Sequence, residues 1–333
     1  MFLSIKNLGK IEAADIKIDG ITVIAGENDT GKSTVGKTLF SVFNSFYQID
    51  RQIYEITILI NRLQSEFSMQ INNLDYPEKI SEIMFIIKEK EIKIQVADND
   101  RIEVFNNISL NTEVIYIDDP HIMDNLHEII ANIPPKYRNH RDHLRVLINK
   151  NKTVSVVDEI IASKKLELIF EKINSICPGE IIKTNTGKFF YREKETGNLI
   201  DVVNMSAGLK TFAIIKTLLL KGCLEENGIL ILDEPEIHLH PKWQLVFAEI
   251  IVLLQKEFNT HILINTHSPY FLDSIEVYSR KHGIAGKCRY YLAEVSDKFP
   301  EMSRFTDVSD NIEQIYKKLA DPLQILEDES YDY

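Results

Sequence analysis

Two stretches of the sequence combine residue types that bind phosphate and metal ions. The first, GENDTGKST at residues 26–34, fits the pattern G-x-x-x-x-G-K-[ST] with Gly26, Gly31, Lys32 and Ser33. Glycines allow such a loop to curl, so that its backbone N–H groups point at an anion. Lys32 would then reach the β- and γ-phosphates of a nucleotide, and the Ser33 hydroxyl would bind Mg²⁺. The predicted phosphate-binding residues are Gly26, Glu27, Asn28, Asp29, Thr30, Gly31, Lys32, Ser33 and Thr34.

The second stretch places two acids directly after an apolar run. GILILDEPE at residues 228–236 has the pattern of a buried strand that ends at Asp233 and Glu234. Asp233 is placed to hold Mg²⁺ through water, and Glu234 to orient or deprotonate an attacking water. HILINTHSPYFLD at residues 261–273 predicts a further apolar strand that ends at His267, which is placed to hydrogen-bond a γ-phosphate. Glu234 and His267 are therefore the candidate catalytic residues.

A further anion site is indicated by NMSAGLKTFAIIKTLLLKG at residues 204–222. Ser206 has the position of a helix N-cap, and the amphipathic helix that follows ends at Gly222. The serine hydroxyl, the N–H of Gly208 and the positive end of the helix would face an anion together. One nucleotide needs a second phosphate site of this kind only when the two sites belong to different subunits.

The elements that must position these residues follow from the pattern of apolar side chains. Residues 21–25 are apolar and β-branched, as expected of a buried strand, and residues 33–43 follow a helical pattern. Residues 237–258 predict a second helix, Ser268 is placed to cap a third, and residues 287–295 predict one more strand. Strands that alternate with helices in this way indicate an α/β fold.

Composition and charge argue against several classes of protein. The chain has 333 residues, is 44% apolar and carries a net charge of −12, which disfavours a surface that grips nucleic acid throughout. Cys177, Cys223 and Cys288 lie far apart and form no C-x-x-C pair, so a zinc or disulfide framework is not expected. No apolar run approaches the ~20 residues that span a bilayer, and the first residues lack a signal-peptide pattern. We therefore expect a cytoplasmic protein without a membrane partner.

Together these motifs resemble those of the head domains of ABC-type ATPases in the SMC, RecF and OLD group. GENDTGKS resembles Walker A, MSAGLK the signature motif, LILDEPEIHLHP Walker B, and NTHSP the switch histidine. DEPE-x-x-LHP followed by THSP is specific to the OLD-like and RecF-like branch, whereas transporter ATPases usually carry DEPTSALD at that point. The resemblance covers roughly residues 1–45 and 200–295. Two positions depart from it, because Asp29 stands where a loop glycine is usual and Leu209 where the signature has a second glycine.

The resemblance implies a P-loop NTPase with an ABC-ATPase-like head, a mixed central sheet, and ATP and Mg²⁺ as ligands. Two heads would pair head-to-tail, with each ATP between the Walker motifs of one subunit and the signature of the other. ATP would favour this homodimer by linkage, and hydrolysis to ADP and phosphate would release it. The residues implied to contact ATP across the subunit boundary are Ser206, Ala207, Gly208 and Lys210.

The interval between the matched parts holds a long coiled coil in SMC relatives, but here it is short and interrupted by prolines and strands. Residues 91–105 predict a hairpin that turns at 98–100, residues 121–176 are mostly helical, and residues 180–203 alternate again. Gln48 and Gln95 are both candidates for the glutamine that contacts Mg²⁺ in this family. The predicted domains are an ATPase head at 1–45 and 200–300, an inserted lid with a short helical arm and antiparallel strands at 46–199, and a C-terminal helix with an acidic tail at 301–333.

Two further groups of residues carry alternative interpretations. KYRNHRDHLRVLINKNK at residues 136–152 is basic within an acidic chain, which predicts either a solvated helix face or a docking surface for nucleic acid or an acidic partner. The docking candidates are Arg138, Arg141 and Arg145. His238 and His240 have the spacing of a zinc-ligand pair, although in this family motif we expect them to shape the loop near the ATP interface.

Three functions fit such a head. The first is the sensor or regulatory ATPase of a bacterial anti-phage defence system, which would control a separate nuclease or toxin. The second is a RecF-like or SMC-like ATPase of DNA repair or chromosome maintenance, and the third is the ATPase subunit of a transporter. The DEPEIHLHP loop argues against transport, and the acidic charge against a constitutive DNA clamp. No Toprim pattern follows His267, so we do not expect this chain to cut nucleic acid itself.

Overall fold

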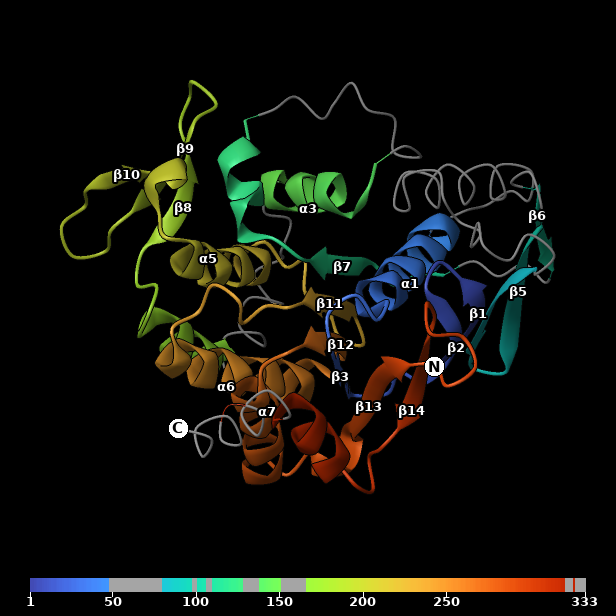
Figure 1. Ribbon diagram of the computed structural model, residues 1–333. Coiled ribbons are helices and arrows are strands. Elements are labelled where there is room, and N and C mark those ends of the chain that lie inside the picture. Colours follow the sequence, from blue (N-terminus) through green and yellow to red (C-terminus); the bar gives the residue numbers. More distant parts are fainter. Residues whose placement is uncertain are drawn as a thin grey trace.

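The computed structural model describes residues 1–47, 80–97, 101–105, 110–127, 138–150, 166–320 and 326. Within these ranges, 11 strands form one sheet in the order β6-β5-β4-β1-β2-β14-β13-β3-β12-β11-β7 (Figure 1). The strands are β1 Phe2–Leu8, β2 Ile11–Lys17, β3 Ile21–Gly26, β4 Ser81–Ile87, β5 Lys90–Ala97, β6 Arg101–Phe105, β7 Val114–Ile117, β11 Ile229–Asp233, β12 His261–Thr266, β13 Cys288–Val295 and β14 Ser303–Asp307.

One half of this sheet is parallel. Strands β7, β11, β12, β3 and β13 are neighbours in that order, and each pairs with the next in parallel. The register aligns Asp233 at the end of β11 with Asn265 of β12, and Asn265 with Ile24 of β3. The carboxyl ends of these strands therefore meet at one edge of the sheet, where ligands bind in folds of this kind.

The other half is built mainly from antiparallel pairs and extends from β14 to β6. Strands β1 and β2 pair antiparallel, and β4, β5 and β6 continue the sheet beyond β1. Phe43 of helix α1 packs edge-on against Phe85 of β4, with ring centroids 4.9 Å apart. Helix α1, which spans Lys32–Phe46, thus connects the two halves of the sheet.

The main sheet contains strands from both segments that the sequence places outside the ATPase head. Residues 46–199 are predicted to form an inserted lid, and β4, β5, β6 and β7 from this interval belong to the main sheet. In the C-terminal part, β14 inserts between β13 and β2 before the helical residues 313–320 begin. Alternating polarity identifies a strand, but it does not identify the sheet that the strand joins.

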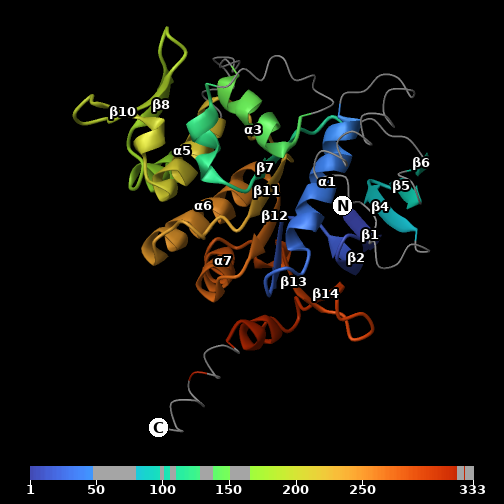
Figure 2. The same ribbon diagram turned by 45° about the horizontal axis from the view of Figure 1, so that its top comes forward.

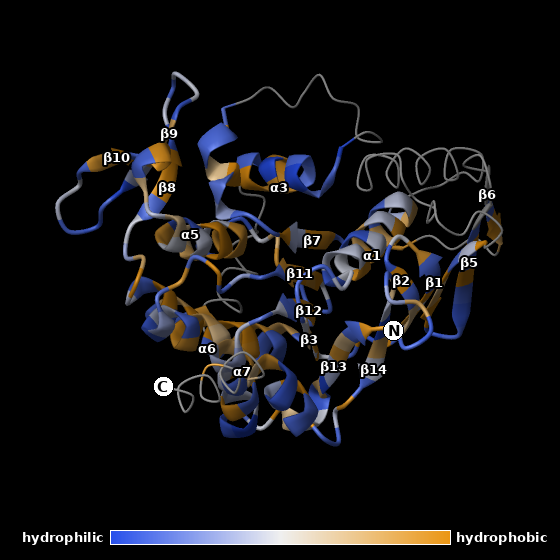
Figure 3. Ribbon diagram, in the orientation of Figure 1, coloured by the Kyte–Doolittle hydropathy of each residue, from blue (hydrophilic) through white to orange (hydrophobic). Residues whose placement is uncertain are grey.

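Helices cover both faces of the parallel strands. The apolar side chains of each strand point alternately to the two faces, so both faces must be shielded from water. In β11, Leu230 and Leu232 belong to the core that contains residues of α5, α6 and α7, whereas Ile229 and Ile231 belong to the core around α1. Figure 3 shows the hydrophobic colouring that runs along β7, β11 and α5. These helices are α5 Ala207–Leu220, α6 Pro241–Phe258 and α7 Pro269–Lys281.

A second, smaller sheet and the helical pieces near it lie on the α5 side of the molecule, at the opposite end from β4 to β6 (Figure 2). A separate antiparallel sheet contains β8 Glu180–Lys183, β9 Phe189–Arg192 and β10 Leu199–Asp201, which confirms the alternation seen at residues 180–203. Helical pieces near it are η2 Pro120–Asn125, α3 His140–Asn149, residues 166–174 and η5 Val202–Asn204. The short turn η6 spans Ala285–Lys287.

Several predictions fall on residues outside the described ranges, namely Gln48, the turn at 98–100 and the acidic tail. The hairpin itself is confirmed, because β5 and β6 pair antiparallel on either side of that turn. In the part of the chain that the structure describes, no helix combines the length and the apolar character that crossing a membrane requires.

Candidate nucleotide-binding site

The phosphate-binding loop lies between β3 and α1, as predicted. All six residues of β3 are buried, so the strand anchors the loop in the core. A Cβ on Gly26 would lie 2.2 Å from the carbonyl oxygen of Ala293 in the neighbouring strand, so only glycine fits there. Gly31 and Asp29 both have left-handed backbone conformations, with φ of 80° and 64°. Aspartate tolerates that conformation better than most residues, which explains how Asp29 replaces a glycine.

The start of α1 is open to an anion. Gly31 is the N-cap and provides no side-chain acceptor, and the first turn of the helix contains no acidic residue. The first backbone N–H groups of a helix lack intrahelical partners, and the helix dipole adds partial positive charge there. This arrangement is the one that binds phosphate in P-loop proteins.

The side chain of Lys32 packs against the phosphate-binding loop itself. Its side chain is only 4% exposed, and its ammonium donates hydrogen bonds to the carbonyl oxygens of Gly26 at 3.2 Å and Glu27 at 2.5 Å. A third contact joins it to the Thr30 hydroxyl at 3.2 Å. Burial lowers the pKa of Lys32 to about 8, although the nearby carboxylates, Glu234 first, oppose that shift. The remaining loop residues Glu27, Asn28 and Asp29 are exposed.

Asp233 is held at the end of β11 by two side chains that the sequence did not single out. The Tyr116 hydroxyl donates to Asp233 Oδ2 at 2.8 Å, and the Asn265 amide donates to Asp233 Oδ1 at 2.8 Å. The same amide lies 3.1 Å from the carbonyl oxygen of Lys32, so β11, β12 and α1 are tied together here. Asn265 lies one residue before the end of β12, and only the pairing of β12 with β11 places it beside Asp233.

The donor set at this point suits Mg²⁺. Asp233 offers a carboxylate that is 9% exposed, and Ser33 follows Lys32 in the first turn of α1 with a hydroxyl. Both are hard oxygen ligands, which Mg²⁺ prefers. Asn265 Oδ1 is also buried here and has no hydrogen-bond partner among the described residues. Ser33 and Asp233 would hold the ion, which would neutralise charge on the phosphate oxygens.

Glu234 and His267 meet although 33 positions of sequence separate them. His267 Nε2 lies 2.7 Å from Glu234 Oε1, and the two side chains are 26% and 33% exposed. Glu234 has a left-handed backbone with φ of 48°, and its N–H donates to the carbonyl oxygen of Asn265 at 2.9 Å. Burial lowers the pKa of His267, the positive charge of Lys32 lowers it further, and Glu234 acts in the opposite direction. The structure therefore brings both candidate catalytic residues together beside Lys32.

Glu236 accepts hydrogen bonds from the residues at the end of β12 and so holds His267 in place. The sequence does not predict it as part of the site. Its side chain is 5% exposed, accepts a hydrogen bond from the Thr266 hydroxyl, and accepts another from the His267 N–H at 3.2 Å. Burial raises the pKa of Glu236 above its ordinary value. Glu236, the last acid of DEPE, thus fixes the backbone at His267, directly after the end of β12.

The signature segment has the predicted local structure. Ser206 is exposed and caps α5, because its hydroxyl accepts a hydrogen bond from the Leu209 N–H at 3.3 Å. Gly208 is buried beneath the loop that follows β11. A Cβ there would lie 3.0 Å from the carbonyl oxygen of His238 and 3.1 Å from the Trp243 ring. Close packing therefore accounts for this glycine within the subunit.

Lys210 does not present its ammonium at the surface of the subunit. Its side chain is 1% exposed, and its Nζ lies 2.6 Å from Asp124 Oδ1 and 3.2 Å from the carbonyl oxygen of Val203. A contact from this amine to ATP of a second subunit is therefore not supported by the geometry. The trans contact remains a proposal for Ser206, Ala207 and Gly208 only.

The basic stretch is largely engaged within the protein. The guanidinium of Arg141 lies 2.8 Å from Asp118 and 3.9 Å from Asp119. Arg145 lies 3.5 Å from Asp142, with only 15% of its side chain exposed. Burial opposes ionisation of Asp118, but hydrogen bonds from His140 and Arg141 outweigh it and hold its pKa at about 2. These contacts favour a structural role for this stretch, and docking through Arg138, Arg141 and Arg145 stays a prediction.

Two other sequence candidates, Gln95 and His240, make hydrogen bonds within the fold. The Gln95 amide donates to Glu82 at 2.6 Å on the antiparallel half of the sheet, so its contact belongs to β4 and β5. His240 is the N-cap of α6, and its Nδ1 accepts a hydrogen bond from the Lys242 N–H at 3.3 Å. His238 faces a different pair of residues, described below.

A buried strand, a glycine-rich loop and an open helix start beside an acidic strand end define a P-loop NTPase of the α/β class. A comparison of the sequence with protein families agrees with this class over most of the chain. The chain belongs to the family described as "AAA domain, putative AbiEii toxin, Type IV TA system", whose model matches residues 21–273.

Among characterised relatives, the chain is 30% identical to the "Retron Ec83 probable ATPase" of Escherichia coli over 43% of its own length and 28% of that protein. It is 33% identical to the "Retron Vc95 probable ATPase" of Vibrio cholerae serotype O1 biovar El Tor over 24% of its own length and 17% of that protein. The chain thus matches less than a third of the length of these relatives.

Solved structures of SMC heads share the fold. The head of Smc bound to the C-winged helix domain of ScpA matches 94% of this chain and 98% of its own, with a TM-score of 0.57 at 14% identity. An Smc head with an extended coiled coil, bound to the C-terminal domain of ScpA and derived from Pyrococcus furiosus, matches 98% of each chain with a TM-score of 0.52 at 14% identity. These likenesses confirm the predicted class, an α/β head with a mixed sheet.

Proposed function

We propose that the protein binds and hydrolyses ATP, and that the hydrolysis switches an assembly of two heads. The observation that carries this proposal is the Glu234–His267 pair, 2.7 Å apart, beside the buried ammonium of Lys32. Glu234 takes the proton of the attacking water, and His267 orients Glu234 and the terminal phosphate. Lys32 and the backbone N–H groups at the start of α1 hold the phosphates.

The pairing of two heads is supported by where apolar side chains are exposed. Ile237 follows Glu234 by three positions and is 64% exposed, and Tyr270 follows His267 by three and is 73% exposed. Val203 precedes Ser206 by three and is 53% exposed. Three motifs of the proposed ATP interface, those of Glu234, His267 and Ser206, therefore lie near a large exposed apolar side chain, which a second subunit would cover.

The biological assignment rests on the relatives. We propose that the protein is an OLD-like regulatory ATPase of a bacterial anti-phage defence system that acts in the cytoplasm with a separate effector, a nuclease or a toxin. The two relatives named as retron ATPases and the family description, which includes a toxin system, support this assignment. The likeness to SMC heads supports the alternative, an ATPase of DNA repair or chromosome maintenance, but it concerns the fold alone.

The proposal is tested first by the variant Lys32→Ala. Removing the ammonium eliminates the charge that stabilises the phosphates, so steady-state ATPase activity should fall by ~10²-fold or more. Lys37→Ala is a matched control, because Lys37 lies in the same helix and is half-buried. Circular dichroism verifies that both variants fold. Lys37→Ala should keep the wild-type rate. If folded Lys32→Ala also hydrolysed ATP at the wild-type rate, this loop would not be the ATP site.

A further inference from the structure

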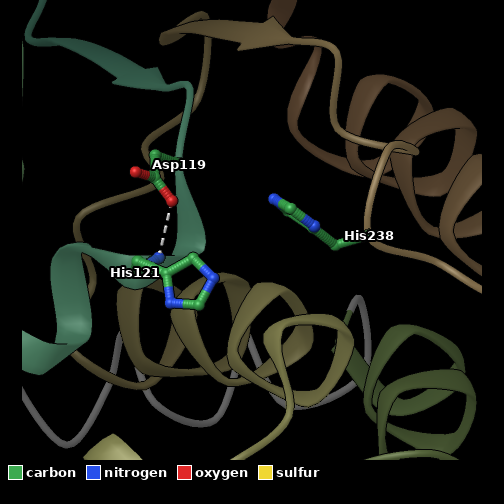
Figure 4. Close-up of side chains that lie close together, drawn as sticks. All are labelled: Asp119, His121 and His238. Atoms are coloured by element: carbon green, nitrogen blue, oxygen red, sulfur yellow. Dashed lines mark hydrogen bonds between the residues drawn. The ribbon is translucent and has the colours of Figure 1, made fainter.

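A second group of possible metal ligands lies beside the nucleotide-binding site and takes no part in it. Asp119, His121 and His238 each offer one ligand atom, and these atoms lie within 4.8 Å of one another (Figure 4). Asp119 and His121 lie at the start of η2, just after β7, whereas His238 lies in the loop between β11 and α6. Figure 4 shows the His238 ring directed across the gap toward the other two side chains. We propose that these three residues bind a transition-metal dication, Zn²⁺ in particular.

His121 is held in the orientation that a metal-binding histidine requires. Its Nδ1 lies 3.2 Å from Asp124 Oδ2, so Nδ1 carries the proton and donates it to the carboxylate, which leaves Nε2 to bind the metal. Asp124 in turn accepts a hydrogen bond from Lys210 at 2.6 Å through its other oxygen. A carboxylate that orients a histidine from behind is the usual second layer of zinc sites.

The other two ligands are also placed by contacts within the fold. Asp119 Oδ1 accepts the His121 N–H at 2.8 Å and caps η2. Asp119 Oδ2 lies 3.9 Å from Arg141, whose shorter contacts are with Asp118. The His238 backbone is packed on Gly208, and the His121 and His238 rings meet edge-on with centroids 5.6 Å apart.

The chemistry of this trio favours zinc over magnesium. Two imidazoles and one carboxylate suit Zn²⁺ and its neighbours, whereas Mg²⁺ prefers oxygen ligands throughout. Tetrahedral zinc with bonds of about 2.0–2.1 Å needs ligand atoms roughly 3.3 Å apart, so the trio must close by about 1.5 Å at most. His121 is 51% exposed and His238 is exposed as well, so both side chains have room for that movement. The fourth position would take water.

A metal ion at this site would connect three elements, which are the loop after β11, η2 and the start of α5. The loop of His238 begins at Glu234, the catalytic candidate. Asp124 links His121 to Lys210 in α5, the helix that Ser206 caps. The bound ion would therefore fasten the loop after β11 to η2 and, through Asp124, to the start of α5. The site depends on neither ATP nor the pairing of heads.

The test is calorimetric titration of chelator-treated, nucleotide-free protein with Zn²⁺, repeated with Co²⁺, whose visible spectrum reports tetrahedral coordination. We expect one ion per chain. His121→Ala and His238→Ala should each weaken binding by ~10²-fold or more, and Asp124→Asn by about tenfold, the smaller effect of losing the orienting group. Asp119→Asn keeps the cap on η2 but removes the charge, so it should weaken binding by at least about tenfold in a protein that folds.

His240→Asn is the matched control. It removes an exposed histidine from the same loop, while asparagine can still cap α6. Zn²⁺ should raise the Tm of wild type and of His240→Asn, and leave that of His121→Ala and His238→Ala unchanged. The proposal fails if wild type does not bind Zn²⁺ or Co²⁺, if folded Asp119→Asn and His238→Ala bind as tightly as wild type, or if His240→Asn loses as much affinity as His238→Ala.

Discussion

Glu234 is the residue at which local strain and proposed chemistry coincide. A glutamate with φ of 48° adopts a conformation that costs about 1 kcal/mol or more, which the fold must offset elsewhere. Its N–H is bonded to Asn265 and its carboxylate to His267, so the conformation is fixed from both ends. Because burial and the charge of Lys32 lower the pKa of His267, the imidazole is neutral near pH 7 and donates its Nε2–H to Glu234.

The lowered pKa of Lys32 predicts that ATP affinity depends on pH. Its pKa of about 8 means that the ammonium loses its proton as the pH rises through about 8, whereas a phosphate binds the charged form. ATP affinity should therefore fall by about tenfold between about pH 7 and about pH 9. Isothermal titration calorimetry measures this directly.

Lys32→Arg provides the comparison, because arginine keeps its charge over this range. This variant should bind ATP more weakly, since the buried loop is shaped around an ammonium, but its affinity should change little with pH. An equal pH dependence in wild type and Lys32→Arg would assign the titration to another group.

At the scale of elements, one buried acid of α6 forms ion pairs with residues 166–174 and with the end of α7. Glu249 is 4% exposed and contacts Lys172, Lys281 and His282, each at 2.8–3.1 Å. Burial opposes its ionisation, but these three hydrogen bonds outweigh burial and hold its pKa at about 2. Residues 166–174, α6 and α7 are thereby joined at a single carboxylate.

Glu249→Gln should lower the free energy of unfolding by about 2 kcal/mol at neutral pH, because charged hydrogen bonds are lost. The sign of the pH effect follows from the lowered pKa. Stability from Glu249 is complete above the ordinary carboxyl pKa near 4.5 and is lost as the pH falls toward about 2. Urea unfolding at several pH values should show a difference between wild type and Glu249→Gln that shrinks on acidification.

Glu257→Gln serves as the control on the same helix, because Glu257 is half-buried and takes no part in the contacts of Glu249. Its unfolding should match wild type. A loss of stability in Glu249→Gln that stayed constant down to acid pH would mean that packing, and not the charge, is what Glu249 contributes.

The sequence predicts the elements around the ATP site well, because their signals are local. The P-loop, the caps Ser206 and Ser268, and the strand end at Asp233 lie where the residue patterns place them, and β12 ends at Thr266, one residue before the predicted end at His267. Tyr116 and Asn265 could not be assigned, because their role depends on which strands become neighbours. The same limit explains why the sequence does not predict that β4 to β7 and β14 join the main sheet.

At the scale of the whole molecule, the account depends on a second copy of the chain. Ser206 is exposed and contacts its own helix, and the apolar residues Ile237, Tyr270 and Val203 lie near the three motifs. We propose that ATP bound between two copies would bury these exposed side chains, and that ATP would therefore favour the paired state. Basic residues of α3 are engaged within the chain, so an effector is expected to recognise the paired heads and not α3 alone.

The most direct test of the central claim is the molar mass of Glu234→Gln, measured by light scattering with ATP and Mg²⁺. The substitution removes the general base, so hydrolysis should fall by ~10²-fold or more and ATP should persist. The account predicts that the mass then doubles, that adding Ser206→Arg abolishes the increase, and that Asn185→Arg, an exposed control in the turn between β8 and β9, leaves it intact. A full ATP-dependent increase in the Glu234→Gln, Ser206→Arg double variant would contradict it, because the signature would then not act across a subunit boundary.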